Sequence, residues 1–156
     1  LKTRIENYQP QMIQALEELV RFESVRGEAK PGAPYGEENA RCLKRALEIA
    51  EELGFRTHNM DGHMGWAEYG EGDEMIAVAG HLDVVAGGDC WTGCKPFEPV
   101  IKDGKMFGRG TMDNKGPIVI SLYALKALID EGFEPKRRIR ILMGCDEETL
   151  ISKKIL

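Results

Sequence analysis

The sequence has 156 residues, of which 42% are hydrophobic and 30% are charged, and its formal net charge is −5. This length suits one domain with a sizeable core. The acidic balance argues against nucleic acid as the main partner, because phosphate binding needs clustered Lys and Arg. No apolar run approaches the roughly 20 residues that span a membrane, and residues 1–8 do not resemble a signal peptide. The chain starts at Leu1 rather than Met, so we expect a natural start upstream.

Two helices and a loop are predicted in the first third of the chain. Residues 9–23 place apolar side chains on one face, which predicts an amphipathic helix. Residues 26–36 are rich in Gly and Pro and predict a loop. A second helix is expected from about Glu37 to Leu53, where Gly54 supplies the C-terminal stop.

Strands and a third helix are predicted in the remainder. Asp103-Gly104 between two short apolar pairs indicates a hairpin, and residues 116–131 have a helical apolar stripe. Short strand patterns occur at 56–60, 66–69, 75–79 and 138–143, and the run at 75–79 is typical of a buried strand. Alternating strands and helices predict an α/β fold with a largely parallel sheet sandwiched between helices. Ligands of such sheets bind beyond the carboxyl ends of the strands.

The four cysteines do not indicate a disulfide framework. Cys42 lies within a helical pattern and Cys145 ends an apolar run, which are ordinary sites for buried free thiols. Cys90 and Cys94 have a C-x3-C spacing that is loose for zinc, and no second pair lies nearby. We therefore expect free thiols and a cytoplasmic location.

Three polar clusters stand where strands are expected to end. His81 and Asp83 are two residues apart, so in an extended segment their side chains point the same way. Asp113 lies in a Gly-rich segment, and Glu147-Glu148 follow the last predicted strand. Imidazole and carboxylate oxygens are suitable zinc ligands, and a neighbouring carboxylate can act as general base.

Each cluster has an ordinary structural explanation when it is taken singly. A lone His-x-Asp is commonly a hydrogen-bonded pair, adjacent glutamates commonly face solvent, and glycines around Asp113 suit a tight turn. No phosphate loop or dinucleotide fingerprint is present. His58 and His63 have no comparable context. The joint placement of the three clusters at strand ends is what favours a functional site.

At these clusters the sequence resembles the M20 zinc metallopeptidase family. The motifs occur in the family's order and spacing, and the likeness extends from the first helix to Thr149. It is strongest to the PepV-like and Xaa-His dipeptidase branch, since the Lys115-Gly116-Pro117 ending favours dipeptidases and carnosinase-like proteins over deacylases. The motifs are Gly80-His81-Leu82-Asp83-Val84-Val85, Gly108-Arg109-Gly110-x-x-Asp113-Asn114-Lys115-Gly116-Pro117 and Asp146-Glu147-Glu148-Thr149.

This resemblance implies a role for each residue. His81 would bind one zinc ion, Asp113 would bridge two, and Glu148 would bind the second, with Mn²⁺ or Co²⁺ as alternative metals. Glu147 would be the general base, and Asp83 would orient His81. The peptide bond after Asp113 is typically cis in the family. The implied fold is a three-layer, zinc-exopeptidase-type catalytic domain with a mostly parallel mixed sheet between helices, and the implied substrates are dipeptides.

The end of the sequence departs from the family. Residues 150–156 match nothing expected, and the inserted lid domain and the distal His ligand are absent from this sequence. We therefore interpret residues 1–156 as a truncated N-terminal portion of the catalytic domain, in which each zinc keeps two of three protein ligands. We expect this chain to be inactive on dipeptides, and its exposed sheet edge predicts aggregation or a homo-oligomer.

Three alternatives stay open on the sequence. The first is another enzyme of the same fold, an N-acyl-amino-acid deacylase or a carboxypeptidase. The second is a non-catalytic remnant that binds metal weakly or only packs. The third is a Mg²⁺ or Ca²⁺ module, which His81 disfavours because these hard cations prefer oxygen ligands. The metal content of the purified chain separates the zinc enzymes from the other two: bound zinc would support an enzyme, and no bound metal would support the remnant.

Overall fold

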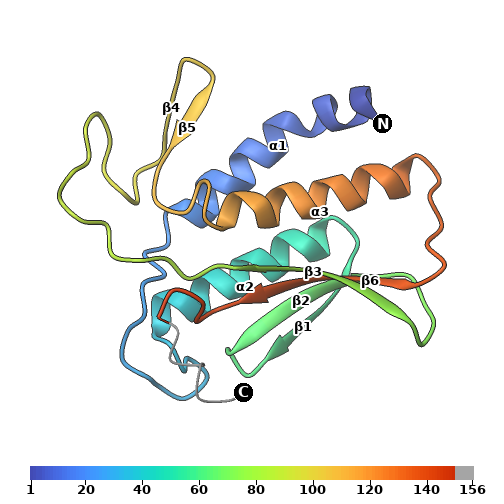
Figure 1. Ribbon diagram of the computed structural model, residues 1–156, viewed down its shortest axis with the longest axis horizontal. Helices are drawn as coiled ribbons and strands as arrows, with labels where there is room; N and C mark the ends of the chain where they lie inside the picture. The colour runs from blue at the N-terminus through green and yellow to red at the C-terminus, as the bar shows by residue number, and fades with distance from the viewer. Residues whose placement is uncertain (150–156) are drawn as a thin grey trace.

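The fold is built on a mixed four-stranded sheet and three long helices (Figure 1). The computed structural model describes residues 1–149. The predicted atypical tail, residues 150–156, lies outside the described residues. The helices are α1 (Lys2–Val20), α2 (Glu37–Glu52) and α3 (Lys115–Asp130), and the strands are β1 (Arg56–Met60), β2 (Met64–Tyr69), β3 (Met75–His81), β4 (Val100–Lys102), β5 (Lys105–Phe107) and β6 (Arg138–Gly144).

The first helix is longer at its start than predicted. It begins at Lys2 rather than at residue 9, passes through Pro10, and ends at Val20. Contacts with the end of α3 stabilise the additional turns: Arg4 Nε donates to Glu131 Oε1 at 3.1 Å, and the Tyr8 hydroxyl donates to Asp130. Local sequence cannot report these long-range contacts, and Pro10 argues locally against an interior helical position.

The second and third helices and the hairpin confirm the prediction. In α2 the apolar stripe is buried, and Gly54 follows the helix at a φ of 89°, a left-handed conformation that glycine adopts without steric cost. Asp103 and Gly104 join β4 to β5 with positive φ at both positions, as a type I′ turn requires. None of the described helices combines the length and apolar character that a membrane crossing needs.

The main sheet has the order β1-β2-β6-β3, which confirms a mixed sheet in an α/β fold. Within residues 1–149 only the β3–β6 pair of this sheet is parallel, and the β1–β2 and β2–β6 pairs are antiparallel, so parallel pairing is less common here than predicted. The reason is the hairpin of β1 and β2, which adds two antiparallel strands beside the parallel pair.

The described helices cover one face of this sheet. A Cβ built on Gly65 would touch Leu43 and Leu47 of α2, and one built on Gly80 would touch Ile118 of α3. Gly65 and Gly80 both pair with Met143 of β6, so they share a face. α1 packs against α3, and the three helices enclose one continuous core with this face of the sheet. The predicted second helical layer is not found within residues 1–149.

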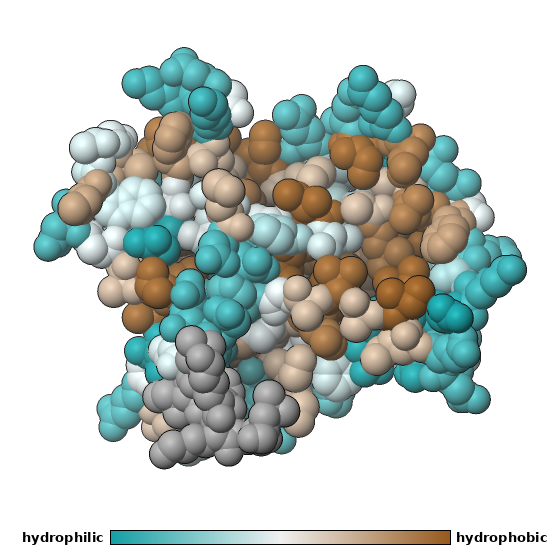
Figure 2. Space-filling model, viewed as in Figure 1, coloured by the Kyte–Doolittle hydropathy of each residue, from teal (hydrophilic) through white to brown (hydrophobic). Residues whose placement is uncertain are grey.

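The prediction that residues 75–79 form a buried strand is wrong for the described chain. β3 forms, but it is the edge strand, and Met75, Ile76 and Val78 are each 44–50% exposed. Figure 2 shows apolar side chains gathered over the region of α3 and β3. Within residues 1–149 no strand pairs with the free edge of β3. The strand therefore has the apolar composition of a buried strand, although its side chains are exposed.

Candidate metal centre

The topology of the sheet brings the three polar clusters to one place. β3 and β6 are parallel neighbours, with His81 opposite Gly144, so their carboxyl ends meet at the same edge. His81 ends β3, and Glu147-Glu148 follow β6. Asp113 lies just before the first residue of α3, which packs against both strands. The structure therefore places these residues at one edge of the sheet, as the sequence predicts.

Three potential ligands converge at this edge. One ligand atom from each of His81, Asp113 and Glu148 lies within 4.8 Å of the other two. His81 Nε2 lies 3.1 Å from Asp113 Oδ1 and 3.8 Å from Glu147 Oε2. The His81 side chain is buried, whereas Asp113 and Glu147 are 72% and 59% exposed. The site therefore has a buried nitrogen at its base and exposed carboxylate oxygens toward solvent.

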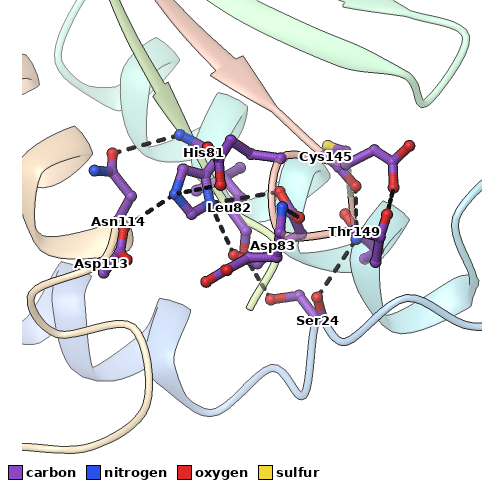
Figure 3. A network of polar contacts seen from close by, with 12 residues as sticks. Ser24, His81, Leu82, Asp83, Asp113, Asn114, Cys145 and Thr149 are labelled. Atoms are coloured by element: carbon purple, nitrogen blue, oxygen red, sulfur yellow. Dashed lines mark hydrogen bonds and ion pairs between the residues drawn. The ribbon is translucent and has the colours of Figure 1, made fainter. Parts of the chain in front are cut away.

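Asp83 is close to His81, but its carboxylate does more than orient the ring (Figure 3). His81 Nδ1 lies 3.0 Å from the backbone carbonyl of Asp83 and 3.5 Å from its carboxylate Oδ1. A proton on Nδ1 therefore satisfies the carbonyl and leaves Nε2 facing Asp113. Asp83 Oδ2 accepts a hydrogen bond of 2.9 Å from the backbone N–H of Glu148. One buried carboxylate thus links two of the predicted clusters.

Burial and hydrogen bonding shift the pKa values of this group. Burial alone would lower the pKa of His81, but its bonds to Asp83 and the charges around it outweigh burial and raise the pKa to about 9. For Asp83, burial alone would raise the pKa, whereas the His81 bond and two backbone amides bring it below its ordinary value. Burial raises the pKa of Glu148, and the negative charge of Asp113 adds to it.

Gly80 and Asn114 pack closely around the backbone of His81. Asn114 Oδ1 accepts the backbone N–H of His81 at 3.4 Å, and the Asp113–Asn114 peptide bond is cis, as the family resemblance predicts. A Cβ on Gly80 would lie 2.5 Å from Asn114 Oδ1 and 2.6 Å from Ile118. Gly80 is thus required for the close approach of β3 to the start of α3.

Sequence reasoning missed the groups that hold the loop after β6. Arg26 Nη1 donates to Asp146, and to Thr149 Oγ1 at 3.2 Å. Asn39 donates to the Cys145 carbonyl at 3.0 Å. Arg26 lies in a predicted loop and Asn39 in a predicted helix, so neither had a local signal of this role. Cys42 and Cys145 are buried and free, as predicted, and Cys90 and Cys94 are also free.

The donor set fits a divalent cation of intermediate softness. One imidazole nitrogen and two carboxylates match Zn²⁺, and also Mn²⁺ or Co²⁺. Among the described residues this is the one group of three or more such side chains with ligand atoms so close, and Cys90 and Cys94 are outside it.

Comparison with known proteins agrees with this geometry. The sequence pattern of the family described as "Peptidase family M20/M25/M40" matches residues 77–154, half of the chain, including all three clusters. The chain belongs to this family. The M20 match covers β3, α3 and β6, the elements that carry His81, Asp113 and Glu148.

Relatives of this M20 chain include proteins named for peptide hydrolysis. YtjP of Bacillus subtilis (strain 168), provisionally named a dipeptidase, is 42% identical over 140 residues, which is 88% of this chain and 30% of YtjP. SAUSA300_1697 of Staphylococcus aureus (strain USA300), with the same provisional name, is 39% identical over 150 residues, 95% of this chain and 32% of the relative.

The solved structures give the same fold. Human carnosine dipeptidase 1 superposes with a TM-score of 0.78 at 25% identity, over 97% of this chain and 36% of that protein. The chain therefore spans about a third of the length of the relatives it matches.

Proposed function

We propose that this M20 chain contributes the core of a metal-dependent dipeptidase site. His81 and Asp113 would hold one zinc ion and Asp113 and Glu148 a second, with Mn²⁺ or Co²⁺ as alternative metals. The observation that supports this best is the convergence of His81, Asp113 and Glu148 at the carboxyl ends of β3 and β6. Family membership supports peptide hydrolysis as the reaction.

Glu147 is suited to proton transfer rather than to metal binding. It lies beside Glu148 but outside the group of converging ligand atoms, and its Oε2 is 3.8 Å from His81 Nε2. The carboxylate is exposed, so water reaches it. As general base, this carboxylate would take a proton from the attacking water. As general acid, it would then pass the proton to the leaving amine.

The remaining residues position this chemistry. His81 presents Nε2 because its Nδ1 proton is held by the Asp83 carbonyl, and Asp83 also fixes the Glu148 backbone. A pair of divalent cations supplies acidification of water and stabilisation of the developing oxyanion. The substrate class, unblocked dipeptides, is supported by relatives named as dipeptidases, and free thiols favour a cytoplasmic location.

The test uses a chimera, because the chain spans a third of its relatives. Residues 1–149 replace the matching segment of YtjP, and the product is assayed on several unblocked dipeptides with Zn²⁺, Mn²⁺ or a chelator. Metal-dependent turnover that Glu147→Gln removes, with metal content unchanged, is the expected result. A folded, metal-loaded chimera that hydrolyses no dipeptide would contradict the proposed activity.

A further inference from the structure

Two buried polar side chains lie behind the candidate metal centre, and the proposed chemistry uses neither. Ser24 is fully buried and Asn39 is 1% exposed. Burying hydroxyl and amide groups is unfavourable unless they form hydrogen bonds. Their partners are therefore informative: each side chain bonds to one of the two segments that carry the site, and the two residues also bond to each other.

Ser24 fixes the segment that follows His81. Its Oγ donates to the Leu82 carbonyl at 2.6 Å, and the N–H of Val84 donates to the Ser24 carbonyl at 3.1 Å. These bonds hold the backbone on both sides of Asp83, as a neighbouring strand would. Ser24 and Leu82 are drawn together in Figure 3. The position of Asp83, and through it of the His81 ring, depends on this pairing.

Asn39 joins that segment to the loop after β6. Its Nδ2 donates to the Cys145 carbonyl at 3.0 Å and to the Ser24 carbonyl at 3.4 Å. Cys145 directly precedes Asp146-Glu147-Glu148. The Asn39 amide thus ties the Cys145 carbonyl to Ser24 and, through Ser24, to the segment after His81, whereas the bond from the Glu148 N–H to Asp83 links the two segments directly. Both partners of Asn39 are carbonyl oxygens, so the side chain must offer two N–H donors, as its NH₂ group does.

We propose that Asn39, acting through Ser24, is a positioning residue that sets the spacing between His81 and Glu148. The inference rests on the proposed function, because the spacing matters only if both residues bind metal. A side chain that only fills the core would affect stability and leave metal affinity unchanged. A positioning residue affects the ligand pair in a chain that is still folded.

The experiment compares Asn39→Leu, which keeps the volume and removes the NH₂ group, with the wild-type chain. The matched control is Leu47→Ala on the same helix, whose side chain packs over Gly65 away from the site. Zn²⁺ affinity is measured by calorimetry well below each unfolding midpoint, and hydrogen exchange of the Glu148 amide is measured by NMR without metal. Asn39→Leu should bind Zn²⁺ at least about tenfold more weakly and exchange faster, whereas Leu47→Ala should change neither.

Each outcome bears on a separate claim. Unchanged affinity and exchange in Asn39→Leu, or equal losses in Leu47→Ala, would overturn the positioning role. A wild-type chain that binds no Zn²⁺ would contradict the proposed function, and the exchange measurement would then decide the positioning role alone. If Asn39→Leu does not fold, Ser24→Ala removes only the hydroxyl bond to Leu82 and is held to the same two criteria.

Discussion

Replacing Asp83 by Asn should remove a pH-dependent part of the stability of the metal-free protein. The change keeps the shape of a side chain that is 2% exposed and removes its charge. The pKa of His81 is about 9, against an ordinary 6.5. This difference of about 2.5 pH units, at about 1.4 kcal/mol per unit, amounts to about 3.5 kcal/mol of folding free energy. The Asp83 carboxylate supplies most of it, and the Asp83 carbonyl and Asp113, which the variant keeps, supply the rest.

The sign of this effect follows from the direction of the shift. A raised pKa means that the folded protein holds the His81 proton more tightly than the unfolded chain does. The stabilisation is therefore complete below pH 6.5 and is lost as the pH rises through about 9. Burial lowers the pKa of Lys115, so the folded protein holds that proton less tightly than the unfolded chain does. This group therefore adds stability as the pH rises, which opposes the effect of His81. Burial, the main cause of the Lys115 shift, is common to both chains, whereas the smaller influence of the Asp83 charge on Lys115 is lost in the variant.

The assay is urea unfolding in chelator, followed by tryptophan fluorescence at pH 6.5 and at pH 9.5. The wild-type chain should have a larger free energy of unfolding than Asp83→Asn, and this difference should be greater at pH 6.5 than at pH 9.5, by up to about 3.5 kcal/mol. NMR titration should show His81 losing its proton at a lower pH in the variant. An equal difference between the two chains at both pH values would refute the assignment of Asp83 as the main partner of His81.

Three further outcomes are expected of the site. In an active chimera, Glu147→Gln should keep its metal and lose about 10²–10⁴-fold in turnover, whereas Glu148→Gln should lose metal; equal metal loss in both variants would contradict these roles. Gly80→Ala should lower the free energy of unfolding by about 1–3 kcal/mol, because its Cβ meets Asn114 and Ile118, and chemical denaturation tests this. Zn²⁺ binding at pH 7.5 should release about one proton from His81, measurable by calorimetry in buffers of different ionisation enthalpy, and an absence of release would show that His81 does not coordinate.

The sequence predicted the site better than its surroundings. His81, Asp113 and Glu148 follow local motifs at strand ends, and strand ends of a parallel pair must meet, so their convergence could be anticipated. The role of the Asp83 carboxylate could not be anticipated from the sequence. Whether it faces His81 or the Glu148 backbone depends on how closely the loop after β6 approaches, and that is fixed by tertiary contacts.

Errors in the fold have the same origin. The composition of β3 describes a strand covered on both faces, but burial depends on what packs against it, and residues 1–149 leave it at an edge. The first helix extends back to Lys2 because Arg4 contacts residues at the end of α3. Ser24 and Asn39 had no local signal, since their partners are backbone groups distant in sequence.

The most direct test of the account is the position of zinc in crystals of this chain. Anomalous scattering at the zinc edge should give its strongest density between His81 Nε2, Asp113 and Glu148, and His81→Ala should remove that density. Density at Cys90 and Cys94 alone, or no density beside His81 at saturating zinc, would contradict the central claim that this edge of the sheet is a metal centre.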